Sequence, residues 1–60
     1  MNFLVKWEDR KGIKYCRKFE NSTDAATFTV GLFNYRDVVK IDVMDEQGNL
    51  IDVFEEEEDL

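Results

Sequence analysis

The chain has 60 residues and a net charge of −6, with eight basic and fourteen acidic side chains, one cysteine and no histidine or proline. A chain of this length holds one domain, and its core gives only marginal stability. The single cysteine excludes an internal disulfide, and without histidine a structural zinc site has too few ligands. Association with another chain is the remaining source of stability, so we expect a homodimer that has no cofactor.

The first predicted element is a β-hairpin, with strands at residues 2–8 and 13–20, because apolar and polar residues alternate in both segments. Between them lies the motif Asp-x-x-Gly at residues 9–12, which favours a type I turn followed by a left-handed glycine. The residues expected on the inner face are Phe3, Val5, Trp7, Ile13, Tyr15 and Phe19.

A helix is predicted next, over residues 22–33, because apolar residues recur at i, i+3, i+4 and i+7. Ser22 or Thr23 is expected to cap its N-terminus, and Asn34 is expected to end it in a left-handed conformation. Glycine and threonine lower the helical propensity of this segment, so packing on a sheet must hold it. The stripe consists of Ala25, Phe28, Thr29 and Leu32.

The second hairpin is predicted over residues 37–54 and repeats the Asp-x-x-Gly motif at 45–48. Its first strand spans 37–44 and its second spans 49–54. The facing of the second strand is ambiguous, because the pairs 50–51 and 53–54 are apolar on both sides. We favour an inner set of Val39, Ile41, Val43, Ile51 and Val53.

These elements predict an α+β fold of the order ββαββ, in which two hairpins form a four-stranded, antiparallel-rich sheet and one helix packs on one face. Residues 1–54 form the single domain, and residues 55–60 form a flexible acidic tail. The chain has no apolar segment near the ~20 residues that cross a bilayer and no secretory signal. A free thiol fits a reducing compartment, so we expect a cytoplasmic protein without membrane association.

The sheet face opposite the helix is predicted to bind a protein partner or a second copy. A single helix covers one face, and an apolar patch left exposed on a small protein indicates an interaction site. Two alternatives are that these residues are scattered singly without such a role, or that an edge strand mediates association. The candidate residues on this face are Leu4, Lys6, Lys14, Cys16, Val38 and Met44, with Leu50 or Phe54 added according to the facing of the last strand.

Charge is distributed unevenly, with six basic and three acidic side chains in residues 1–20 but two basic and eleven acidic in residues 21–60. A terminal acidic run is most often a solvated tail that keeps a small protein soluble. Alternatively, it belongs to a surface that imitates nucleic-acid phosphates and occupies a basic cleft of another protein. The residues of this acidic surface are Asp52, Glu55, Glu56, Glu57, Glu58 and Asp59.

The sequence argues against catalysis and against direct nucleic-acid binding. No histidine provides a base near neutral pH, and Cys16 has no imidazole partner, so we expect it to be a buried or half-buried small hydrophobic residue. The basic and aromatic residues of the first hairpin could contact bases, but the net charge opposes phosphate.

Three segments resemble many tiny proteins encoded by bacteriophages and prophages, which often contain a strand, a helix bearing Ala and Phe, and a hairpin with a D-x-x-G turn. The resemblance covers most of the chain, its motif is structural, and it carries over no functional residue. It implies a phage or mobile-element accessory protein; several such proteins bind and disable a host enzyme or defence complex, often as dimers. The segments are Phe19-Glu-Asn-Ser-Thr-Asp-Ala-Ala-Thr-Phe28, Val39-Lys-Ile-Asp-Val43 and Asp45-Glu-Gln-Gly-Asn-Leu-Ile51.

The sequence therefore predicts a non-enzymatic protein-binding module that acts stoichiometrically on a host protein, in the bacterial cytoplasm if it comes from a phage. One alternative is an acidic nucleic-acid mimic that blocks a DNA- or RNA-handling protein. Another is a small structural or assembly subunit. The partner itself is not defined by these residues.

Overall fold

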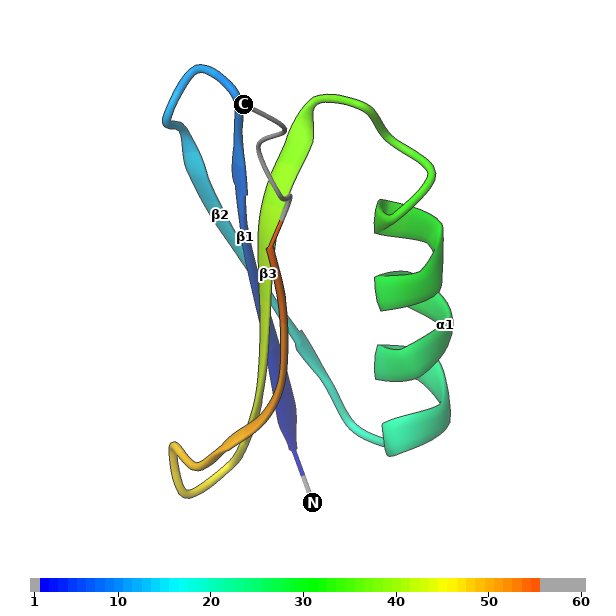
Figure 1. Cartoon of the computed structure of the whole chain (residues 1–60). Helices are drawn as coiled ribbons and strands as arrows, with labels where there is room; N and C mark the ends of the chain where they lie inside the picture. The colour runs from blue at the N-terminus through cyan, green and yellow to red at the C-terminus, as the bar shows by residue number, and fades with distance from the viewer. Residues whose placement is uncertain (1, 56–60) are drawn as a thin grey trace.

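The computed structural model of this chain describes residues 2–55 and has the predicted ββαββ order (Figure 1). Its elements are β1 (Phe3–Asp9), β2 (Lys14–Phe19), α1 (Ser22–Leu32), β3 (Val38–Asp45) and β4 (Leu50–Glu55). The four strands form one antiparallel sheet in the order β2-β1-β3-β4, and α1 lies across one face. We call the opposite face the open face. Within residues 2–55, no helix has the length and apolar character needed to cross a membrane.

The turn between β1 and β2 is built around the carboxylate of Asp9. Its Oδ1 accepts hydrogen bonds from the backbone N–H groups of Lys11 and Ile13, each at 2.9 Å, and its Oδ2 accepts one from the hydroxyl of Tyr15 at 3.1 Å. Gly12 has the predicted left-handed backbone, with φ of 83°. Partial desolvation raises the pKa of Asp9, but the three hydrogen bonds outweigh it and leave the pKa below its ordinary value of 3.8.

The turn between β3 and β4 repeats this design around Asp45. Its Oδ1 accepts hydrogen bonds from the backbone N–H groups of Gln47 and Asn49, each at 2.9 Å, and Gly48 has φ of 85°. The hydrogen bond from the Asn49 N–H is the main cause that lowers the pKa of Asp45 below 3.8. Each aspartate therefore orders the loop that it begins, as the repeated motif predicts.

Asn21 caps α1, one residue before the predicted cap at Ser22 or Thr23, so that prediction was wrong. The Asn21 side chain accepts a hydrogen bond from the backbone N–H of Asp24 at 2.8 Å and donates one to the Asp24 carboxylate at 2.9 Å. This reciprocal pair satisfies the helix terminus. Amide and hydroxyl side chains both act as caps, so residue type alone could not choose between them.

The helix ends at Leu32 rather than at Phe33, and its end is right-handed. Phe33 has φ of −59°, and no non-glycine residue in 2–55 has a positive φ, so the predicted left-handed Asn34 was wrong. The connection to β3 is fixed from outside the helix, because Nε of Arg10 donates a hydrogen bond to the carbonyl oxygen of Arg36 at 2.8 Å. The first hairpin turn therefore positions the start of β3.

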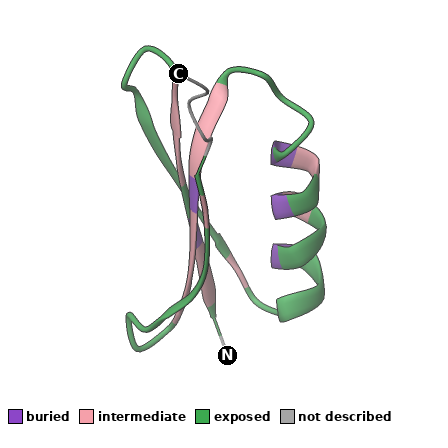
Figure 2. Ribbon diagram, viewed as in Figure 1, coloured by how far each residue is buried: buried purple, intermediate pink, exposed green. Residues whose placement is uncertain are grey.

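The core lies between α1 and the centre of the sheet (Figure 2). The predicted helical stripe faces inward, and its buried Thr29 donates a hydrogen bond to the carbonyl oxygen of Ala25 at 2.8 Å. The buried apolar residues are Val5, Ala25, Leu32 and Ile41, and the partly buried residues packed around them are Phe3, Trp7, Phe19, Phe28, Val38, Val43 and Phe54.

A β-bulge changes the facing of the first residues of β3. Glu8 lies opposite Lys40 while Asp9 lies opposite Val38, so Val39 has no partner on β1. Because the extra residue reverses the alternation, Val38 packs against the core and the predicted placement of Val38 on the open face was wrong. Val39 was predicted to be the inner residue of this pair, which was also wrong.

A second register shift alters β4, where Ile51 has no partner on β3. Beyond it, Phe54 lies opposite the buried Ile41 and packs against the core. Val53, which was predicted to face inward, therefore lies on the open face. The strand continues through Glu55, the first residue of the predicted tail, and residues 56–60 lie outside the described residues.

Ile41→Ala is expected to lower the free energy of unfolding by about 2–5 kcal/mol, because it leaves a cavity beneath α1. A core of this size supplies about 3–5 kcal/mol, so much of the variant should be unfolded at room temperature, as measured by circular dichroism in urea. Val53→Ala, on the open face of the adjacent strand, is the control and should cost about 1 kcal/mol or less. Equal losses would contradict this description of the core.

The two turn carboxylates should make stability depend on pH in the acid range. Because the folded-state pKa of each is lowered, their stabilisation is fully present above 3.8 and is lost as the pH falls through the folded-state pKa. Asp45→Asn should lower the Tm at neutral pH and flatten its decline in acid, as followed by thermal unfolding. Asp52→Asn, outside both turns, should retain the wild-type decline; an unchanged profile for Asp45→Asn would refute the assignment.

Candidate protein-binding surfaces

The open face brings together five of the six residues predicted to bind a partner; the sixth, Val38, faces the core. Leu4 lies opposite Met44, and Met44 lies opposite Leu50, so three apolar side chains form a row across β1, β3 and β4. We call these three residues the apolar row. Leu4 and Met44 are half-buried, while Leu50 is 56% exposed. The row is continuous, which distinguishes it from singly scattered apolar residues.

Charged residues on the open face alternate in sign. One row crosses all four strands from Lys14 through Glu8 and Lys40 to Glu55. Nζ of Lys40 lies 3.5 Å from Oε1 of Glu55, and both side chains are substantially exposed, so this ion pair contributes about 1 kcal/mol or less. Because each cation has an acidic neighbour, this row offers no continuous basic surface to a phosphate backbone.

Cys16 lies on the open face of β2, opposite Lys6. Its thiol is exposed, so the predicted burial was wrong. The reason is that β2 is an edge strand and that no layer of residues 2–55 covers this face. Within the same residues, no group of three or more potential ligands is arranged to hold a metal ion.

The aromatic residues of the first hairpin pack together on the helix side. Trp7 stacks on Tyr15, with ring centroids 5.4 Å apart, and meets Phe28 of α1 edge-on at 5.1 Å. The guanidinium of Arg17 lies 5.2 Å from the ring centroids of both Phe19 and Phe28. These contacts hold Arg17 on the helix side of β2 and give the aromatic residues a structural role.

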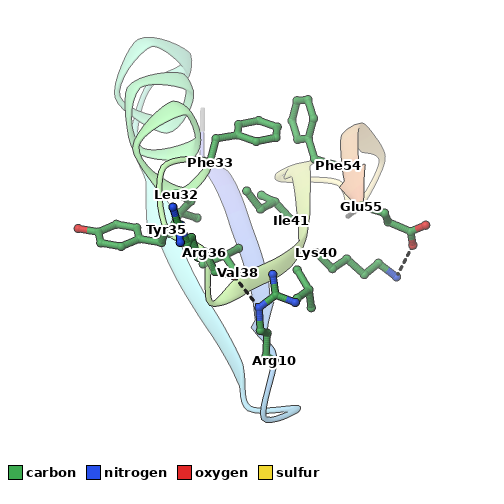
Figure 3. Close-up of a pocket in the computed structure, with 11 residues that line it drawn as sticks. Arg10, Leu32, Phe33, Tyr35, Arg36, Val38, Lys40, Ile41, Phe54 and Glu55 are labelled. Carbon is green, nitrogen blue, oxygen red and sulfur yellow. Dashed lines mark hydrogen bonds and ion pairs between the residues drawn. The ribbon is translucent and has the colours of Figure 1, made fainter. Parts of the chain in front are cut away.

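A groove that the sequence did not reveal lies between α1 and β4. The helix packs against β1, β2 and β3, and it meets β4 where the rings of Phe33 and Phe54 lie edge to face, 4.4 Å apart (Figure 3). Beside this contact the groove has a volume of about 310 Å³, and its lining includes Ala26, Val30 and Ile51. Val30 and Ile51 are 63% and 52% exposed, so the groove is open to a ligand.

A second hollow, of about 260 Å³, lies on the other side of the Phe33–Phe54 contact (Figure 3). Arg10 and Lys40 line it, but Arg10 is bonded to the carbonyl oxygen of Arg36 and Lys40 is paired with Glu55. The charged groups of this hollow therefore hold the loops and β4 in place.

The predicted acidic surface is only partly within the described residues. Asp52 lies opposite Val43 and therefore on the helix side of β4, whereas Glu55 lies opposite Lys40 on the open face. These two carboxylates thus point to opposite sides of the sheet. Glu56, Glu57, Glu58 and Asp59 lie outside the described residues.

Comparison of the chain with protein-family models, with curated proteins and with solved structures finds no match. The function must therefore be inferred from the physical character of the surfaces. Those with the clearest character are the apolar row, the groove beside α1 and the two edges of the sheet.

Cys16 is expected to react with iodoacetamide in the folded protein within about tenfold of its rate in denaturant, because its reactivity needs no opening of the fold. Mass spectrometry of samples quenched at intervals measures both rates. A folded-state rate that is many times slower would show that another surface covers β2.

Proposed function

We propose that this protein is a non-enzymatic protein-binding module that docks on its partner through the open face. The observation that carries the proposal is the apolar row of Leu4, Met44 and Leu50, which spans three adjacent strands and adjoins the exposed Val53. A continuous apolar area on a small protein is characteristic of an interaction site.

The surroundings of the apolar row match the composition of an interface. Protein interfaces have an apolar centre and a polar rim, and here Lys18 and Lys6 on one side and Asp42 on the other border the row. Charged rim groups of both signs favour one orientation of a partner over others. The open face therefore supplies both an adhesive centre and an orienting rim.

The proposed partner is a host protein in the cytoplasm of a bacterium, which this protein binds and modulates stoichiometrically. The resemblance to small phage and prophage accessory proteins supports this setting, as does a chain with one free cysteine and no histidine. A defence component is one kind of host protein that such an accessory protein binds.

The acidic-mimic alternative would require closely spaced carboxylates over one surface. Within residues 2–55, Asp52 and Glu55 point to opposite sides, and the acidic residues of the open face alternate with lysines. Docking through the apolar row has a continuous surface behind it, and the mimic has none there.

Met44→Lys should weaken partner binding by about tenfold or more, because it places a charge at the centre of the apolar row. The tagged protein is used to capture partners from bacterial lysate at low and high salt, and affinity is then measured with the purified partner. Wild-type binding should change little with salt, since apolar contact dominates.

Thr27→Lys, an exposed change on α1 with the same charge, is the control and should bind like the wild type. Equal binding by Met44→Lys and the wild type would refute docking through the open face. Binding to a DNA- or RNA-handling protein that disappears at high salt would instead support the acidic mimic.

A further inference from the structure

The two edges of the sheet carry opposite charge. The outer strand β2 contains Lys14, Arg17 and Lys18 and no acidic residue, whereas the outer strand β4 contains Asp52 and Glu55 and no basic residue. An edge strand presents unpaired backbone groups that can add another strand, and charge on an edge opposes pairing with an edge of the same sign. Each edge is thus protected from its own kind, and neither is protected from the other.

The direction of the strands also suits a contact between β4 of one copy and β2 of another. Each neighbouring pair in the order β2-β1-β3-β4 is antiparallel, so β2 and β4 run in opposite directions. A second copy placed beside the first in the same orientation brings its β2 antiparallel to β4. The sheet then continues with the pairing used throughout the molecule.

The cross-strand rows show what this contact would pair. Continued into a second copy without a shift, they place Glu55 opposite Lys14 of the next copy. They also place Asp52 opposite Arg17 of the next copy, so both acidic residues of β4 meet a base. From β2 to β4, three successive rows are Lys14, Glu8, Lys40, Glu55; Tyr15, Trp7, Ile41, Phe54; and Cys16, Lys6, Asp42, Val53; the fourth is Arg17, Val5, Val43, Asp52.

The same contact closes the groove beside α1. It places Phe54 opposite Tyr15 of the next copy on the helix side, where aromatic cross-strand pairs are favourable. The helix of the next copy lies over its own β2 and would form the missing wall of the groove. Val30, Phe33 and Ile51, each more than half exposed in the single chain, would then be covered.

We propose that this protein self-associates head to tail, by antiparallel pairing of β4 of one copy with β2 of the next. A two-fold dimer through either edge would set like charges against each other, so the expected homodimer is replaced by a contact between unlike surfaces. Such a contact forms rings or open chains. The inference does not depend on the proposed function, since it uses the edges and the helix side and leaves the open face free.

The test is a charge exchange between Lys14 and Glu55, measured by sedimentation velocity of the full chain over a range of concentrations. Wild-type mass should rise with concentration in low salt and fall towards the monomer in high salt. Lys14→Glu alone and Glu55→Lys alone should each associate about tenfold more weakly, because each sets like charges opposite. An equal mixture of the two variants should recover association, because every contact again joins opposite charges.

Lys11→Glu and Glu46→Lys are the matched controls, since they make the same charge changes in the two hairpin turns and should associate like the wild type. Circular dichroism establishes that each variant is folded, and Asp52→Lys mixed with Arg17→Glu provides a second exchange. Met44→Lys should associate normally, which separates this contact from docking through the open face. A wild type that stays monomeric, or a mixture no stronger than its separate variants, would overturn the proposal.

Discussion

One helix is narrower than a four-stranded sheet, and this mismatch determines which surfaces of the molecule stay exposed. A helix with its side chains is about 10 Å wide, whereas strands about 4.8 Å apart make four of them span about 14 Å between the outer axes. Here α1 packs over β1, β2 and β3. The helix side of β4 is left partly uncovered, and the open face is left bare among the described residues. The groove and the apolar row are both consequences.

The features that the sequence predicted correctly are those encoded by adjacent residues. The Asp-x-x-Gly motif is self-sufficient, because the aspartate binds the backbone of its own loop at Asp9 and again at Asp45. Alternation in β1 likewise placed Phe3, Val5 and Trp7 on the helix side. Together with the helical stripe, these local signals were enough for the ββαββ order and for five of the six open-face candidates.

The features that the sequence did not predict depend on contacts between distant segments. At Val38-Val39 either valine could have faced inward, and the bulge opposite Asp9 decided for Val38. At β4 the skipped residue was Ile51, in a segment apolar on both sides. The groove depends on where α1 settles across the sheet. Neither propensity nor alternation contains that information.

Strand order also gives the charge distribution a meaning that composition lacks. Basic residues concentrate in the first hairpin and acidic residues in the second. Because β1 and β3 pair at the centre, the outer strands come from different hairpins and the two edges acquire opposite sign. Had β2 and β4 met at the centre, these charges would have been neutralised within one chain.

Head-to-tail pairing and docking through the open face are mutually compatible, and their combination has a physical consequence. Copies joined at β2 and β4 would carry their open faces on the same side of one continuous sheet, so the apolar row of Leu4, Met44 and Leu50 would recur in each copy. A partner with several sites would then be held by many contacts whose avidity exceeds that of one. A partner with one site would gain nothing from the repetition. The valency of the partner therefore separates an assembly subunit from a one-to-one inhibitor.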